Sequence, residues 1–414
     1  MKRTTPTIEI LILMILVPVI LCQISCTQRN DTEVPSFSSP SATIHVTASP
    51  APTPVITVTP EPAATVAGRT YTLSDDTILL SKLDQATADE LDAALDVLSS
   101  VSRVDLTACD DCAAYMETLV HSHPDTLFIW NVPIPESTCP STAESIDLTG
   151  VSIESVDIVR SFLPYFPSLN TLILSDTGLE NEDLAALQQL YPDIDIIWTV
   201  YFCNGKRSLR TDAIAYSTKN TTKVKQTTRQ QKMRLQDADA QVLQYCTKLV
   251  ALDLGHNEIS DLSFLSGMQN LQILILADNK ITDISVLSGL KKLQYIELFM
   301  NRIEDISPLG ELPILVDLNL CHNRVSDLSP LYKCKLLDRL WVSNCKIPKK
   351  SRAEIQESLP DTDIKFDIPD DTAAGWRKHE RYFWMHSYFY PEQFDATPVP
   401  NADPPGLRTP SPEN

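Results

Sequence analysis

Apolar residues recur with a period of 22 residues along the second half of the chain. The repeating units begin at Leu249, Leu271, Leu293 and Leu315, and a partial fifth unit begins at Leu337. Within each unit apolar and polar residues first alternate, as in Leu252-Asp253-Leu254. Alternation with a period of two is typical of a strand that buries one face. The sequence therefore predicts one short strand per unit over residues 249–347.

The rest of each unit predicts a turn, a return to the core and a short helical turn. The ninth position holds Asn257, Asn279, Asn301, Asn323 and then Cys345. An amide side chain donates and accepts hydrogen bonds together, so it can satisfy the backbone of neighbouring turns. Further on, Asp305-Ile306-Ser307-Pro308 has the residues of a helix start. Because no unit can bury its apolar side alone, the units are predicted to stack into an array.

This pattern resembles the leucine-rich repeat, in the 22-residue class found in bacterial internalins. The resemblance implies an α/β solenoid with a parallel sheet on its concave face. It also implies that Cys345 is structural, because cysteine replaces asparagine at this position in the family. The resemblance is most specific over residues 249–347 and extends in weaker form over residues 100–367.

The region before the array shows the same pattern in longer and less regular units. Residues 101–109 and 169–177 match the strand pattern. The segments 124–130 and 192–198 look like duplicates, and each follows an amphipathic helical stretch. Residues 70–204 are therefore predicted to form an irregular α/β repeat region.

Residues 205–248 are predicted to form a polar insertion followed by a helical cap of the array. The part from Gly205 to Arg234 is locally basic, and a helix is expected near Asp237 to Tyr245. A basic segment on an exported protein could contact anionic wall polymer. The alternative is a solvated insertion, which is what charge runs usually are.

Residues 348–394 are predicted to form a C-terminal cap. Ser351-Arg352-Ala353-Glu354 is a capping box that opens a helix. Residues 360–366 repeat the Pro-Asp pattern of the two upstream duplicates, and residues 376–390 contain seven aromatic side chains. We expect the aromatic segment to pack on the last repeat, since aromatic clusters usually fill cores. A ligand-binding or membrane-surface role is the alternative.

The outward positions of the predicted strands form a candidate binding face. The candidate partner-binding residues are Tyr295, Phe299, Trp341, Ile275, Glu297, Asp253 and Arg339. Exposed aromatic patches with a charged rim are typical of protein interfaces. The alternative is that a terminal cap or the upstream region covers them.

Other motifs give no catalytic or metal site. The column Asp261, Asp283, Asp305 and Asp327 could bind calcium, but capping of the helical turns explains it without metal. Cys109-Asp110-Asp111-Cys112 lacks a second pair at zinc-finger distance, and a disulfide among Cys109, Cys112, Cys139 and Cys203 stays open. His256 and His322 lack a nucleophile context. We expect no enzyme, no cofactor and no metal.

The N-terminus carries an export signal. A basic start, Met1-Lys2-Arg3, precedes an apolar run from Ile10 to Cys22. Gln23-Ile24-Ser25-Cys26 resembles a bacterial lipoprotein cleavage box, which implies that residues 1–26 are a signal peptide and that Cys26 is lipidated. An ordinary cleaved signal or an uncleaved anchor is the alternative. Residues 27–69, rich in Pro, Ser and Thr, are predicted to form a disordered stalk, and residues 395–414 a similar disordered tail.

Charge narrows the choice of partner. The formal net charge is −20, and nucleic-acid binding needs a basic face, so we expect no nucleic-acid partner. The sequence predicts a monomeric, extracytoplasmic protein, anchored by lipid to the cell membrane or secreted, that binds a protein partner in adhesion. The alternative is an envelope structural protein that binds anionic wall polymer or another envelope component.

Overall fold

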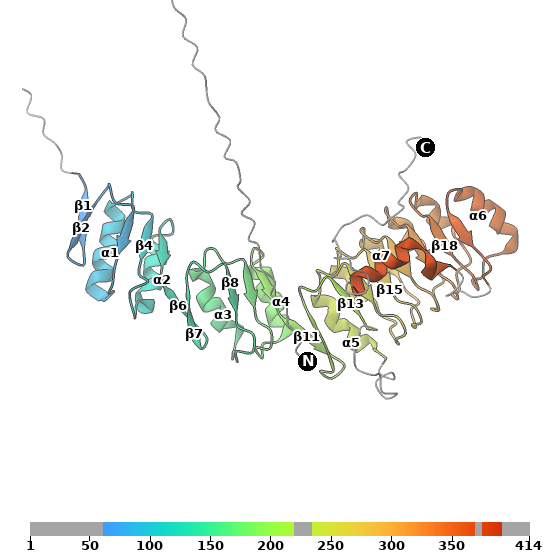
Figure 1. Cartoon of the computed structure of the whole chain (residues 1–414), viewed down its shortest axis with the longest axis horizontal. Coiled ribbons are helices and arrows are strands. Elements are labelled where there is room, and N and C mark those ends of the chain that lie inside the picture. Colours follow the sequence, from blue (N-terminus) through green and yellow to red (C-terminus); the bar gives the residue numbers. More distant parts are fainter. Residues whose placement is uncertain (1–60, 219–233, 369–374, 391–414) are drawn as a thin grey trace, which may run out of the picture. The chain divides into compact units, whose positions relative to one another are not determined.

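The computed structural model describes residues 61–218, 234–368 and 375–390 (Figure 1). The predicted signal peptide with Cys26, residues 27–60 of the predicted stalk, part of the polar insertion and the predicted tail lie outside these ranges. The prediction that the stalk extends to residue 69 is wrong, because residues 63–66 form a strand whose Val66 is fully buried. In the parts of the chain that the structure describes, no helix has the length and apolar character needed to cross a bilayer.

Three β-hairpins each precede a parallel sheet, so the same arrangement occurs three times along the chain. The first group contains β1 (Ala63–Val66), β2 (Arg69–Thr72), β3 (Thr77–Leu79), α1 (Gln85–Val97), β4 (Arg103–Asp105), α2 (Ala113–Ser122) and β5 (Leu127–Ile129). Strands β1 and β2 pair antiparallel, and β3, β4 and β5 form a parallel sheet.

The second group repeats this order. It contains β6 (Asn131–Ile134), β7 (Ser137–Pro140), β8 (Ser145–Asp147), α3 (Val156–Phe162), η1 (Leu163–Tyr165), β9 (Thr171–Ile173), α4 (Asn181–Leu190) and β10 (Asp195–Ile197). The segments that look like duplicates in the sequence contain β5 and β10, the last strands of the first two sheets. A tryptophan follows each of these strands, and its backbone N–H donates to a hydroxyl beyond the next hairpin: Trp130 to Ser141 at 3.2 Å and Trp198 to Thr211 at 3.1 Å.

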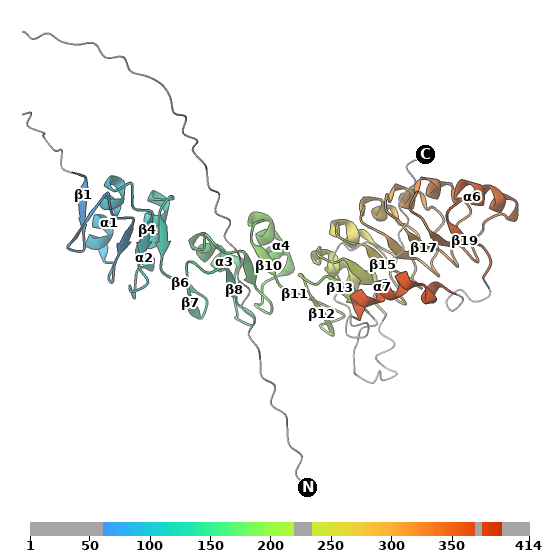
Figure 2. The ribbon, with the colours of Figure 1, turned by 45° about the horizontal axis from the view of Figure 1, so that its top comes forward.

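The third group is the regular array. Its strands are β11 (Thr199–Phe202), β12 (Arg207–Arg210), β13 (Ala215–Ser217), β14 (Ala251–Asp253), β15 (Ile273–Ile275), β16 (Tyr295–Glu297), β17 (Asp317–Asn319), β18 (Arg339–Trp341) and β19 (Asp363–Lys365). Strands β13 to β19 form a parallel sheet in chain order (Figures 1 and 2). This repeated strand geometry is that of a leucine-rich-repeat solenoid.

Short helices complete the array. They are α5 (Asp237–Gln241), η3 (Val242–Tyr245), η4 (Ser263–Gly267), η5 (Ser285–Gly289), η6 (Ser307–Glu311), η7 (Ser329–Lys333), η8 (Lys349–Ser351), α6 (Arg352–Ser358), η9 (Trp376–Lys378) and α7 (Glu380–Phe389). Four of them, η4 to η7, follow successive strands of the array and stack on one another. Leucine and isoleucine side chains between the sheet and these turns form the core, and most of them are fully buried.

The ladder asparagines connect successive turns of the array. The Asn301 amide donates to the carbonyl oxygens of Leu276 at 2.9 Å and Leu298 at 3.0 Å, and its oxygen accepts from Ile281 N–H at 3.1 Å. Asn257, Asn279 and Asn323 make equivalent bonds. The Cys345 thiol donates to the Leu320 carbonyl at 3.2 Å, so it replaces one part of the amide's role.

We expect Asn301→Ala to lower the free energy of unfolding by about 2–4 kcal/mol, because buried backbone groups in two turns lose their partners. Asn301→Cys is the matched control, since a thiol can keep one of these bonds, as Cys345 does. It should cost about half as much. Urea unfolding followed by circular dichroism measures both, and equal losses for the two variants would contradict the role of the amide.

The structure corrects the prediction of a polar insertion that starts at residue 205. Residues 207–210 form β12, which pairs with β11, and residues 215–217 form β13, which joins the array sheet. The rest of the insertion, residues 219–233, lies outside the described residues. Helices α5 and η3 lie where the helical cap was predicted.

The cysteines carry no disulfide in the described residues, where Cys109, Cys112, Cys139 and Cys203 are all free. Burial raises the pKa of the Cys112 thiol to about 11 and that of Cys246 to about 12. These thiols are therefore protonated at neutral pH and belong to the core.

Candidate interaction surface

The outward side chains of strands β13 to β19, which we call the third-sheet face, are brought into rows by the register of the sheet. One row runs from Ile273 through Tyr295 and Asp317 to Arg339. The next row runs from Asp253 through Ile275 and Glu297 to Trp341. The structure therefore places the candidate residues together on one face, as the alternation predicted.

The expectation that this face meets solvent is wrong. Six of the seven candidate residues are buried, with exposed fractions of 1% for Tyr295, 4% for Trp341, Ile275 and Asp253, 5% for Arg339 and 9% for Glu297. Phe299 is partly buried. The cause is the chain's own segment 375–390, which contains η9 and α7 and packs on the face (Figures 1 and 2).

The placement of this segment also corrects a second prediction in part. The sequence predicts that the aromatic segment packs on the last repeat, and Trp376 does so, against Trp341 of β18. Helix α7, however, contacts β13 and β14 at the other end of the sheet. The segment therefore crosses the sheet, because the apolar side chains that match it are spread over several strands and are not concentrated at the end of the array.

Apolar contacts hold both η9 and α7 on the third-sheet face. The Trp376 ring lies 5.6 Å from that of Tyr295 and 5.4 Å from that of Trp341, measured between ring centroids. Met385, Tyr388 and Phe389 belong to the same buried cluster, together with Ala251, Ile273 and Ile275 of the sheet. Burial of a side chain of this size contributes roughly 1.5–3 kcal/mol.

A buried charge cluster lies at the centre of the face. Asp317, with no exposed side-chain surface, accepts from Arg339 Nε at 2.9 Å. Arg381 of α7 also binds it, with Nε at 2.9 Å and Nη2 at 3.0 Å, and reaches Asp338 as well. Burial opposes the charge of Arg381, but the bonds to Asp317 and Asp338 outweigh burial and raise the pKa of its guanidinium. The cluster binds the segment through an aspartate that already has a partner within the sheet.

Glu297 forms a second polar contact with the segment. Its carboxylate accepts from Trp376 Nε1 at 2.7 Å and from the Tyr295 hydroxyl at 2.5 Å. Burial raises the pKa of the Tyr295 phenol well above its ordinary value, and the charge of Glu297 adds to this shift. The Arg339 guanidinium lies 4.3 Å from the centre of the Trp376 ring, which is a cation–π contact.

Gly375 begins the segment, and His379 precedes α7 as its N-cap. Gly375 has a φ of 131°, a conformation that other residues rarely adopt. His379 caps α7, and its Nδ1 accepts from Arg381 N–H at 3.3 Å, which requires this nitrogen to be unprotonated. Burial lowers the pKa of His379 from 6.5, and the charges of Arg339 and Arg381 lower it further, against Asp317 and Glu380.

We therefore expect the segment to open more readily as the pH falls below the ordinary histidine pKa. The open form takes up a proton at its ordinary pKa and the closed form only at a lower one, so closure is fully stabilised above that range and weakened below it. Protection factors of the α7 amides against hydrogen exchange, compared at pH 7.5 and 5.5, measure the effect. His379→Asn keeps a cap that does not titrate, and it should remove the pH dependence. An unchanged pH dependence in that variant would contradict the assignment to His379.

The edge of the third-sheet face stays accessible. The eighth position of each repeat has a positive φ and holds His256, Asp278, Met300, His322 and Asn344. Met300 is 45% exposed, and Phe383 on the outer side of α7 is 48% exposed. The Phe299 ring meets His322 edge-on at 5.3 Å. This edge is the part of the candidate surface that a partner can reach while the segment is closed.

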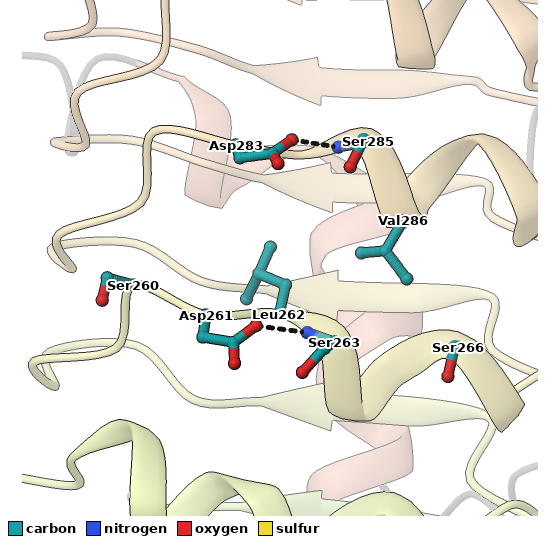
Figure 3. A pocket seen from close by; sticks show the side chains of 8 residues that line it. All are labelled: Ser260, Asp261, Leu262, Ser263, Ser266, Asp283, Ser285 and Val286. Carbon is teal, nitrogen blue, oxygen red and sulfur yellow. Dashed lines mark hydrogen bonds between the residues drawn. The ribbon is translucent and has the colours of Figure 1, made fainter.

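The aspartate column lies elsewhere, between the helical turns. Figure 3 shows Asp261 and Asp283, each just before a helical turn of the array. Both line an open hollow between η4 and η5 with a volume of about 450 Å³. Each carboxylate accepts from the N–H of a serine two residues later, at 2.9 Å for Ser263 and 2.8 Å for Ser285. The column therefore caps the turns. Over the described residues, no group of three or more His, Cys, Asp or Glu side chains is placed to hold a metal ion.

Comparison with known proteins supports the repeat. A family model described as leucine-rich repeats in two copies matches residues 269–311, and a model described as a leucine-rich repeat matches residues 245–262. Internalin C2 of Listeria monocytogenes is 20% identical over 56% of this chain and 84% of its own, with a TM-score of 0.29. A second Listeria monocytogenes internalin, inlF, is 15% identical over 74% of this chain and 87% of its own, with a TM-score of 0.28. The curated proteins give no match.

The chain therefore contains leucine-rich repeats, and none of these descriptions is that of an enzyme. The two internalin structures have TM-scores too low to add to this conclusion. Leucine-rich repeats in general mediate protein–protein interaction.

Proposed function

We propose that this leucine-rich-repeat chain is a non-catalytic, protein-binding module displayed outside the cytoplasm, with the third-sheet face as its recognition surface. The observation that carries the proposal is that this face already binds a protein segment. A helix packs there through buried aromatic rings and a shared carboxylate, which is the helix-in-groove mode of recognition. The proposed contacts are Tyr295, Trp341, Ile275, Glu297, Asp253, Arg339 and the partly buried Phe299.

The location rests on the N-terminal sequence. The basic start, the apolar run and Cys26 support export and lipid anchoring, and the Pro-rich residues 27–60 support display at a distance from the membrane. In cells of the native host, Cys26→Ser should move the protein from the membrane fraction to the medium. Retention of that variant in the membrane would contradict lipidation of Cys26.

Wall polymer receives less support as the ligand. In the described part of the basic segment, Arg210 makes two bonds to Asp212, at 3.0 and 2.9 Å. Arg207 donates to the Tyr216 hydroxyl at 3.3 Å and to the Thr218 carbonyl at 3.2 Å. Both guanidinium groups therefore have structural partners.

The test is capture of the full chain on an array of purified host and bacterial surface proteins, beside purified anionic wall polymer. The test variant combines Tyr295→Ala, Phe299→Ala and Trp341→Ala. The matched control combines Leu79→Ala and Leu127→Ala, two exposed side chains on the first sheet. We expect a surface protein to capture the wild type and the control but not the test variant. Circular dichroism should show that the leucine-rich repeats of the test variant are still folded. Binding to polymer alone, unchanged by the test variant, would refute the proposal.

A further inference from the structure

We infer that residues 375–390 are a built-in ligand of the third-sheet face, and that the partner is a basic, aromatic, amphipathic α-helix that binds by displacing them. The inference rests on the proposed binding function of this face and names the class of partner. It concerns a single occupant, a helix with an arginine among aromatic residues.

The first argument is that the array does not need this segment to close its ends. At one end, α6 and β19 follow the last full repeat, and Ile355 and Leu359 of this region are buried. The Thr362 hydroxyl donates to the Leu337 carbonyl at 2.7 Å and fixes β19 to the sheet. At the other end, β13 pairs with β14, and α5 and η3 lead into the first repeat. A repeat array needs caps at its two ends, and other elements supply both, so the segment has a different role.

The second argument is charge complementarity. The contact region of the sheet carries four acidic residues, Asp253, Glu297, Asp317 and Asp338, against one basic residue, Arg339. On the segment, Arg381 of α7 binds Asp317 and Asp338. An arginine placed among aromatic side chains is complementary to this acidic region. The face therefore selects a cationic helix over the acidic surfaces that dominate this chain.

The third argument is that the carboxylates of the face keep partners within the sheet when the segment leaves. Asp317 keeps Arg339, and Glu297 keeps the Tyr295 hydroxyl. Asp253 keeps the Ser217 hydroxyl at 3.0 Å and the Gly255 N–H at 2.9 Å. Each of these three carboxylates therefore keeps a hydrogen bond when the segment opens. In a permanent buried ion pair, by contrast, separation would leave a carboxylate without a partner.

Opening does expose apolar surface. Ile273, Ile275, Tyr295 and Trp341 lie under the segment in the buried cluster. A contiguous apolar patch of this kind is rarely left in water and marks a binding site. The open form is therefore stabilised when a second helix takes the place of the first, so release and partner binding are coupled.

The segment itself shows what the face accepts. Its buried anchors are Trp376, Arg381, Met385, Tyr388 and Phe389. The last four are spaced along one side of a helix, as anchors in helix-in-groove recognition are. The outer side carries the exposed Arg377 and Phe383. A partner helix with an arginine followed at four and seven or eight residues by large apolar side chains has the chemistry that this face recognises.

The experiment uses the full chain and a labelled synthetic peptide with the sequence of residues 375–390 as the probe. In the wild type the resident segment competes, so the apparent affinity for the peptide is reduced by the fraction of open molecules. We expect the Arg381→Ala chain to bind the peptide at least tenfold more tightly than the wild type does. The Lys378→Ala chain, altered at an exposed position of the same segment, should match the wild type. A peptide carrying the Arg381→Ala change should bind weakly to every chain.

A second variant, Trp376→Ala, repeats the measurement if the Arg381→Ala chain does not fold. Equal peptide binding by the wild type and the loosened chains, or no binding to a chain whose segment is open by hydrogen exchange, would overturn the inference. Dimerisation of the loosened chains without peptide binding would overturn it too, in favour of a second copy as the occupant. Because the probe is synthetic, its binding does not depend on the array of surface proteins. If no surface protein captures the chain but the peptide binds, the proposed capture of surface proteins is refuted. The inference that the third-sheet face binds a helix would still stand.

Discussion

The Asp317→Asn variant is expected to unfold with a free energy about 3–5 kcal/mol below that of the wild type. Asp317 has no exposed side-chain surface and binds the guanidinium groups of both Arg339 and Arg381. Removing the charge of Asp317 leaves the buried Arg339 without its carboxylate and Arg381 with Asp338 alone, and breaking a buried pair in this way is strongly destabilising. Urea unfolding followed by circular dichroism measures the loss.

The control for this prediction is Asp157→Asn. Asp157 pairs with Arg160 on α3 at 3.0 Å, but its side chain is 77% exposed. An exposed pair contributes up to about 1 kcal/mol, so this variant should unfold almost as the wild type does. If both variants lost the same free energy, burial of the charge cluster would not be the source of its effect.

The Trp376→Ala variant is expected to be cut by chymotrypsin within residues 382–390 at least roughly 100-fold faster than the wild type. The indole packs between Tyr295 and Trp341, stacks on Arg339 and donates to Glu297. Truncation of a buried tryptophan costs about 3–5 kcal/mol, and every 1.4 kcal/mol changes an equilibrium roughly tenfold. Cleavage in the native state follows the open population when closing is fast.

Lys378→Ala is the control for the proteolysis, because this side chain is exposed within the same segment. Its cleavage rate should stay within about twofold of the wild-type rate. A Trp376→Ala chain that is cut no faster than this control would show that the tryptophan does not hold the segment closed.

Local periodicity is the reason that the array could be predicted. The strands, the asparagine ladder and the Asp-x-Ser turns repeat every 22 residues, so each position is supported by several copies of itself. The hairpins have less support, because each of their strands is only four residues long. A turn signal was nevertheless present at Asn204-Gly205, where both residues have positive φ.

The cover of the third-sheet face could not be predicted from the repeat. Alternation shows that Tyr295 and Trp341 share a face, but it does not show what lies on that face. The contact between Arg381 and Asp317 joins residues that are 64 positions apart, and no period relates them. The available signal was composition: a basic segment with seven aromatic side chains in an acidic chain. The charged and aromatic third-sheet face has a complementary segment, residues 375–390, in the same sequence.

The most direct test of this account is hydrogen exchange of the wild-type full chain, followed by mass spectrometry over a series of low urea concentrations. A built-in ligand opens without unfolding the array. We predict that the amides of α7 lose their protection at urea concentrations where strands β14 to β18 are still fully protected. Loss of protection in α7 and in these strands at the same urea concentration would mean that the segment is a permanent part of the array, and would contradict the account.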